Sequence, residues 1–159
     1  MTCPTPAFHE LEARYGELLS WCDLLEAIAD FLPCRVNDRL CGMVADGLLP
    51  LLLTSHRLEE QIGSDWLGAI MSGSERSETE DHLEAGRLVN LESAQDVVEV
   101  LQALHGGRGS LSFDAVNYLL RSFFYGLRRH IAAQRRIIRR IDAAPGPSSA
   151  WRDPDRPMV

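Results

Sequence analysis

Lysine is absent from this chain of 159 residues, and all 16 of its basic side chains are arginine. We interpret this as the codon bias of a GC-rich genome rather than as a chemical requirement. No stretch of the sequence approaches the ~20 consecutive apolar residues that a membrane-spanning helix needs. The formal net charge of −7 argues against general binding to nucleic acid, because phosphate backbones attract a net basic face.

Cysteine is also scarce, and the four cysteines show neither C-x-x-C spacing nor the density of a disulfide scaffold. The N-terminal segment has neither the basic start nor the apolar core of an export signal, so we expect a cytoplasmic location. We find no Gly-rich phosphate loop, no dinucleotide fingerprint and no Ser-His-Asp arrangement with supporting spacing. On these grounds the sequence does not predict an enzyme.

Helical periodicity is what the sequence does contain. Apolar residues recur at intervals of three and four in four segments, at about residues 6–31, 37–61 or beyond, 77–106 and 112–142. Pro50 lies inside the second segment and is expected to bend it. The capping-box pattern from Ser77 to Glu80 is expected to open the third. Short connections predict an all-α, antiparallel up-down-up-down four-helix bundle over residues 1–142, followed by a Pro-rich, loosely held tail at 143–159.

Three histidines fall on the apolar stripes of three different segments. His56 is followed one turn later by Glu60, and His82 and His130 lie in the third and fourth segments. At ~1.5 Å of rise per residue, Tyr15 is expected near the height of His56, and His82 near that of His130. Imidazole and carboxylate ligands on facing helices suit iron, zinc or manganese. The alternative is that each histidine is a core residue satisfied by hydrogen bonds.

Other polar residues are expected at the surface. Glu59 is predicted to point away from the Glu60 face, and His9 to face solvent. Six arginines gather at the end of the fourth segment, at Arg128, Arg129, Arg135, Arg136, Arg139 and Arg140. We interpret them either as a solvated helix end that pairs with the acidic helices or as a surface for a protein partner.

The order of these residues resembles that of the hemerythrin-like, HHE cation-binding domain. The resemblance covers about residues 6–142 and rests on the H-x3-E pattern late in the second helix, one histidine near the start of the third and one in the fourth. The phrases ELLSWCDLLEAIADFLP, LLPLLLTSHRLEEQ and LLRSFFYGLRRHIAAQRR are similar in texture to bacterial members. The resemblance implies a bundle that holds two irons bridged by carboxylates and that binds or senses dioxygen.

Carried over position by position, four ligands of that family match this sequence, and they are His56, Glu60, His82 and His130. Tyr15 stands in place of the histidine of the first helix. Gly86 falls where the third helix is expected to supply a second ligand, and Gln134 or Arg135 where the fourth supplies an acid. The resemblance therefore implies a reduced site with one ion held by the four matching residues. Tyr15 would be either a phenolate ligand or a hydrogen-bond donor to Glu60.

Two functions follow from this interpretation. The first is an iron-binding bundle, with one or two ions, that senses dioxygen, nitric oxide or redox state without catalytic turnover. The alternative is a metal-free regulatory or adaptor protein that acts through a protein partner. In that case the buried polar residues must satisfy one another, because an unpaired buried carboxylate is costly. They would form a polar layer of Tyr15, His56, Glu60, His82, His130 and Gln134.

Overall fold

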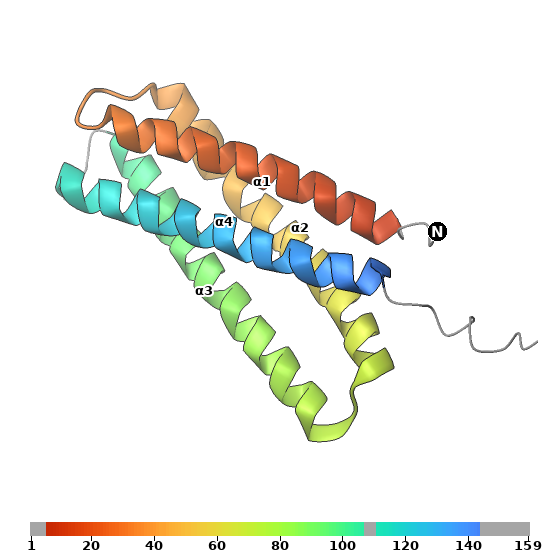
Figure 1. The fold of residues 1–159 in the computed structure, drawn as a ribbon. Coiled ribbons are helices and arrows are strands. Elements are labelled where there is room, and N and C mark those ends of the chain that lie inside the picture. Colours follow the sequence, from red (N-terminus) through yellow and green to blue (C-terminus); the bar gives the residue numbers. More distant parts are fainter. Residues whose placement is uncertain (1–5, 107–110, 144–159) are drawn as a thin grey trace, which may run out of the picture.

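The chain folds into four helices that pack in the order in which they occur. The structure is a computed structural model, and it describes residues 6–106 and 111–143. The helices are α1 (Pro6–Phe31), α2 (Asp38–Ile70), α3 (Gly73–Gly106) and α4 (Phe113–Ala143), with no strand among the described residues. The helix pairs in contact are α1 with α2, α2 with α3, α3 with α4 and α4 with α1 (Figure 1). The predicted all-α, up-down-up-down bundle is confirmed.

The last residue of α4 is Ala143, and it is also the last residue that the structure describes. The Pro-rich tail predicted at residues 143–159 therefore lies, apart from Ala143, outside the described residues. Among the helices that are described, none combines the length and the apolar character that crossing a membrane requires.

The inward face of α1 follows the spacing of three and four residues that the sequence predicts for this segment. Its buried residues are Leu11, Tyr15, Leu18, Cys22, Leu25, Ile28 and Ala29. Burial raises the pKa of the Cys22 thiol to about 12, so this side chain stays protonated and packs as a small apolar group. On the outer side of the same helix His9 is exposed, as predicted.

The second helix extends beyond Gln61, within the range that the sequence allows. Of Asn37 and Asp38, either of which can cap a helix by its residue type, Asn37 is the cap, because its side-chain oxygen accepts hydrogen bonds from the backbone nitrogens of Arg39 and Leu40. It then continues through Pro50 and past Gln61 as far as Ile70. The glycines between Gln61 and Ile70 do not end the helix, because the next turn is set by a later residue.

That residue is Gly73, which begins α3 four residues before the predicted start at Ser77. Its φ of 69° lies in the left-handed region that glycine adopts without strain, and it lets α2 and α3 join in a tight turn. Ser77 and Glu80 therefore lie inside the helix, and Glu80 accepts a hydrogen bond from Arg76 instead of capping. The predicted capping box is wrong for this reason.

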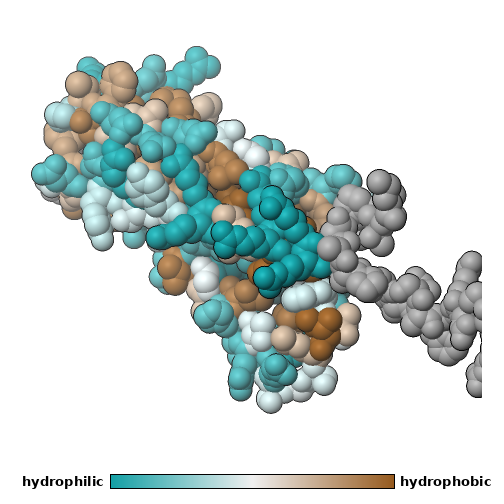
Figure 2. All heavy atoms as spheres, viewed as in Figure 1, coloured by the Kyte–Doolittle hydropathy of each residue, from teal (hydrophilic) through white to brown (hydrophobic). Residues whose placement is uncertain are grey.

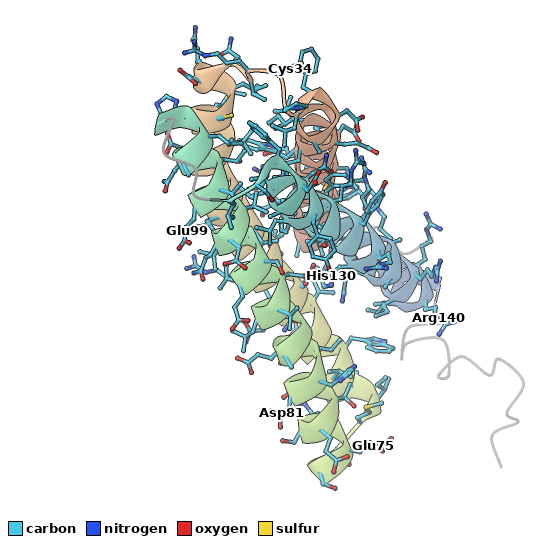
Figure 3. All side chains as sticks on the ribbon, turned by 90° about the vertical axis from the view of Figure 1, so that its left-hand side faces the viewer. Cys34, Glu75, Asp81, Glu99, His130 and Arg140 are labelled. Carbon is cyan, nitrogen blue, oxygen red and sulfur yellow. The ribbon has the colours of Figure 1, made fainter. Side chains whose placement is uncertain are left out.

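The hairpin of α2 and α3 extends away from the other two helices, and its turn projects beyond them (Figure 1). Glu75 and Asp81 lie on this projecting part, well separated from His130 (Figure 3). Only the C-terminal half of α3 packs in the bundle core, where Ala94, Val97 and Leu101 are buried. The spacing of this segment predicts an inward stripe that includes His82, Val89, Val97 and Val100. The stripe is right for Val97 and Val100, which are buried, and wrong for Val89, which is 61% exposed.

Helices α1 and α4 are joined along their length by ion pairs. Three arginines of α4 spaced seven residues apart contact acids of α1: Arg121 with Asp30, Arg128 with Asp23 and Glu26, and Arg135 with Glu12. The predicted pairing with an acidic helix is thus confirmed for Arg128 and Arg135. Among the described residues, the other four arginines of this end have no ion-pair partner, and hydrophilic side chains gather over this half of α4 (Figure 2).

The close packing of α1 on α2 gives a test of the fold. A Cβ added at Gly47 would meet the ring of Trp21 at 2.5 Å, whereas one added at Gly42 would meet nothing within 4 Å. Replacing Gly42 with alanine is expected to raise the free energy of unfolding by ~0.5–1 kcal/mol through helix propensity. Gly47→Ala is expected to lower it by ~1–3 kcal/mol through overpacking. Urea denaturation checks both, and equal effects would contradict this packing.

Candidate metal centre

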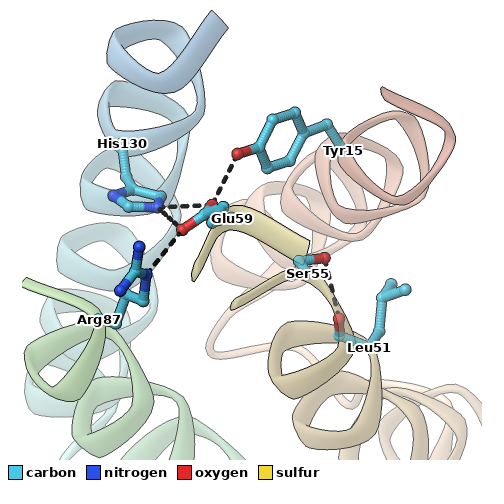
Figure 4. A network of polar contacts seen from close by, with 6 residues as sticks. All are labelled: Tyr15, Leu51, Ser55, Glu59, Arg87 and His130. Carbon is cyan, nitrogen blue, oxygen red and sulfur yellow. Dashed lines mark hydrogen bonds and ion pairs between the residues drawn. The ribbon is translucent and has the colours of Figure 1, made fainter. Parts of the chain in front are cut away.

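A single buried carboxylate joins all four helices. Glu59 of α2 is 4% exposed, and its two oxygens accept hydrogen bonds from three other helices (Figure 4). The Tyr15 hydroxyl of α1 donates to Oε1 at 2.7 Å, and Arg87 Nε of α3 donates to Oε2 at 3.3 Å. His130 Nε2 of α4 lies 2.9 Å from Oε1 and 3.1 Å from Oε2. Glu59 is therefore a polar contact that all four helices share.

These partners keep the carboxylate charged. Burial by itself would raise the pKa of Glu59, since removal from water disfavours the ionised form. The hydrogen bonds and charge interactions with His130, together with the hydrogen bond from Tyr15, outweigh burial and hold the pKa below its usual value. The buried group is thus a carboxylate near neutral pH, and it is available as a metal ligand.

Tyr15 occupies the position on α1 that the sequence predicts, and it is fully buried. Burial, followed by the charge of Glu59 and the hydrogen bond to it, raises the pKa of the Tyr15 phenol far above its usual value. Of the two roles expected for Tyr15, the structure has the hydrogen-bond donor, with Glu59 and not Glu60 as the acceptor.

His56 is the one buried side chain in this layer that is left unsatisfied. Its Nε2 has no hydrogen-bond partner among the described residues, although the ring is only 8% exposed. The neighbouring Ser55 hydroxyl donates to the Leu51 carbonyl of the preceding turn, so it does not serve the imidazole (Figure 4). Burial lowers the pKa of His56 to about 4, although the charge of Glu59 opposes this shift. At neutral pH the ring is uncharged and can offer a lone pair.

His56, Glu59 and His130 form a group that can hold a metal ion. Each offers one ligand atom, and these atoms all lie within 4.8 Å of one another. The two imidazole rings meet edge to face with 6.1 Å between their centroids. Ligand atoms bound at ~2.1 Å in a tetrahedral arrangement stand ~3.4 Å apart, so the separations in this group are of the size that one ion requires.

The structure does not bring Glu60 into this group. Glu60 is exposed, and the adjacent Glu59 takes the buried place that the sequence interpretation gave to Glu60. The positions i+3 and i+4 from His56 both lie near its face of the helix, and the continuing core stripe decides between them. That stripe runs from His56 through Glu59 to the buried Ile62, and this apolar residue three positions on was the signal available in the sequence.

His82 is also outside the group, because it is exposed on the projecting hairpin. The residue of α3 that reaches Glu59 is Arg87, five positions later. Five residues correspond to ~7.5 Å along the helix and ~140° around it, so the two side chains leave α3 in different directions. The prediction that His82 lies level with His130 in the interior is wrong, because it assumed that α3 packs on α4 along its whole length.

Comparisons of the sequence with protein-family models and with curated proteins, and of the fold with solved structures, find no match for this chain. The resemblance to hemerythrin-like domains therefore rests on the residue pattern alone.

The environment of Glu59 predicts that substitutions of Glu59 and of the adjacent Glu60 differ strongly in their effect on stability. Glu59→Gln removes the countercharge of Arg87 and is expected to lower the free energy of unfolding by about 3 kcal/mol, since breaking a buried ion pair leaves the other charge uncompensated. Glu60→Gln, at the exposed neighbouring position, is expected to change it by less than ~0.5 kcal/mol. Urea denaturation with a chelator present measures both. Equal losses in the two variants would show that Glu59 is not the buried partner.

The lowered pKa of His56 predicts a pH dependence of stability in metal-free protein. Between the unfolded pKa of ~6.5 and the folded value of about 4, only the unfolded state binds the proton. The free energy of unfolding is therefore highest above pH ~6.5, and it decreases by up to ~3 kcal/mol as the pH falls towards 4. His56→Gln should flatten the profile over this window. A wild-type profile that is already flat there would contradict the buried neutral imidazole.

Proposed function

We propose that His56, Glu59 and His130 bind one iron ion, and that the protein is a divergent hemerythrin-like bundle that senses dioxygen, nitric oxide or redox state. The observation that carries this proposal is the buried Nε2 of His56, which has no partner among the described residues. A buried polar atom without a partner is costly. An ion shared with Glu59 and His130 would satisfy it.

The ligand types support iron in particular. Two imidazoles and one carboxylate form the set that holds Fe(II) in many non-haem iron proteins, and it leaves coordination positions open for a small exogenous ligand. Iron would supply redox chemistry and affinity for such a ligand. The residues of this chain supply the three protein ligands, the hydrogen bond from Tyr15 that orients Glu59, and a largely buried surrounding.

One ion fits this layer better than two. Glu59 is the only carboxylate of the ligand group, whereas a pair of ions needs several carboxylates to balance its charge. The guanidinium of Arg87 lies 3.3 Å from Glu59 and already supplies one positive charge at the site. A second ion would stand close to that charge and would be repelled by it.

A regulatory role is favoured by the way in which the site connects the helices. Glu59 contacts residues from α1, α3 and α4. A movement of its carboxylate would therefore change one hydrogen bond to each of these helices. The α2–α3 hairpin projects from the bundle (Figure 1), and both of its helices contribute to the contacts of Glu59. We propose that ligand binding is read out through this hairpin, without catalytic turnover.

A metal-free adaptor is the second candidate, and one observation favours it. Glu59 already has donors from three helices and a countercharge in Arg87, so the carboxylate itself is satisfied without an ion. Its partner surface would be the end of α4, where Arg129, Arg136 and Arg140 have no ion-pair partner among the described residues.

Metal analysis of protein purified without oxygen separates the two candidates. Wild-type protein titrated with Fe(II) and then freed of loose metal is expected to retain about one iron per chain. His56→Gln should retain less than a tenth of that amount, because it loses a buried nitrogen ligand. His82→Gln is the matched control, since His82 is exposed, and it should retain iron as wild type does.

Other numbers of retained iron ions per chain would contradict the proposed site. Two irons per wild-type chain would overturn the single-ion site. Equal iron in the His56 and His82 variants would place the metal elsewhere. Wild-type protein that retains no iron, zinc or manganese would favour the adaptor.

A further inference from the structure

A narrow cleft lies where the α2–α3 hairpin diverges from α1 and α4. Its volume is about 120 Å³, and Glu59 and Arg87 are among the residues that line it. Most of its walls are apolar side chains from all four helices, including Leu11, Ile62, Trp66, Leu83, Ile138 and Ile141. The cleft therefore combines an apolar interior with one ion pair.

Arg87 is only partly used by the protein. Its Nε donates to Glu59, but its two terminal nitrogens have no hydrogen-bond partner among the described residues (Figure 4). Neither of them is among the fully buried atoms that lack a partner, and the side chain is 13% exposed. These nitrogens therefore keep some accessible surface, and Arg87 is one of the residues that line the cleft. The terminal edge of the guanidinium, formed by these two nitrogens, can donate two parallel hydrogen bonds to an anion.

We propose that this cleft binds a short-chain aliphatic monocarboxylate. Its carboxylate accepts hydrogen bonds from the terminal nitrogens of Arg87, in the planar two-point geometry that arginine and carboxylates share. Its hydrocarbon chain lies against Ile62, Trp66 and Ile138. The pair of Glu59 and Arg87 has no net charge by itself, and arginine can contact two carboxylates at once through different edges.

The size and the walls of the cleft restrict the ligand. A cleft of about 120 Å³ admits only a small acid, and butyrate is the probe chosen here. Inorganic phosphate would leave the apolar walls without a partner. A dicarboxylate would place its second charge against isoleucine and leucine, at a high desolvation cost. A neutral alcohol of equal length would fill the cleft but would lack the charge that complements Arg87.

This inference does not rest on the proposed iron site, because protein side chains alone hold the monocarboxylate. It is therefore tested with metal-free full-length chain in the presence of a chelator. Failure of iron binding would leave the result of this titration unaffected.

The experiment is a titration with sodium butyrate followed by 1H–15N NMR. The chain has three tryptophans, and the indole N–H signals of two of them serve as reporters in one sample. Trp66 lines the cleft, whereas Trp21 lies against Gly47 and is not among the lining residues. The Trp66 signal is expected to shift saturably with a Kd on the order of 1 mM, and the Trp21 signal to stay in place. Sodium chloride at equal ionic strength, 1-butanol and inorganic phosphate should each bind at least tenfold more weakly.

Two variants test whether the shift of the Trp66 signal comes from butyrate bound in the cleft. Arg87→Gln is expected to weaken butyrate binding at least tenfold. Because Arg87 also contacts Glu59, Gly63→Met provides a second variant that leaves this ion pair intact. Gly63 lines the cleft and has no neighbour within 4 Å of an added Cβ, so the methionine side chain fills the space that the ligand needs.

Gly42→Met is the matched control, on the same helix and outside the cleft. It should bind butyrate as wild type does, whereas Gly63→Met should bind at least tenfold more weakly. Equal binding of butyrate and 1-butanol, unchanged binding in Gly63→Met, or no saturable shift of Trp66 would each overturn the proposal.

Discussion

The ion pair and hydrogen bonds of Glu59 are the constraint on which the rest of the structure depends. A buried carboxylate is tolerated only when donors surround it, and here one donor comes from each of the other three helices. Apolar side chains can slide past one another at small cost, but Tyr15, Arg87 and His130 must each meet the same two oxygens. The carboxylate therefore fixes the relative heights of α1, α3 and α4 on α2.

The same constraint creates the two chemical features of the molecule. Tyr15 and His130 both bond to Glu59, and His56 beside them keeps a buried nitrogen without a partner in the described part of the chain. Glu59 engages Arg87 through Nε alone, and Arg87 is one of the residues that line the cleft. A metal ion and an organic acid would thus bind on different sides of one carboxylate, and each would act on contacts that link all four helices.

Much of this could be predicted from the sequence, because it follows from local rules. The spacing of apolar residues predicts the helices, and Asn37 or Asp38 predicts the start of α2. The stripes predict the buried positions of Tyr15 and His56 and the half-buried position of His130. The choice of Glu60 over Glu59 was wrong because a spacing of four was preferred to the stripe that leads to Ile62. The choice of His82 was wrong because nothing in the spacing of α3 reveals that half of the helix leaves the bundle.

The sequence by itself determined that the chain forms four amphipathic helices and that histidines and acids occur among their apolar residues. Helix formation depends on neighbours three and four positions apart, and these are adjacent in the chain. Only the tertiary structure decided which carboxylate is buried, that Arg87 rather than His82 approaches it, and that a cleft opens beside it. Those outcomes depend on the angle at which the hairpin of α2 and α3 leaves α1 and α4, which is set by packing between residues far apart in the sequence.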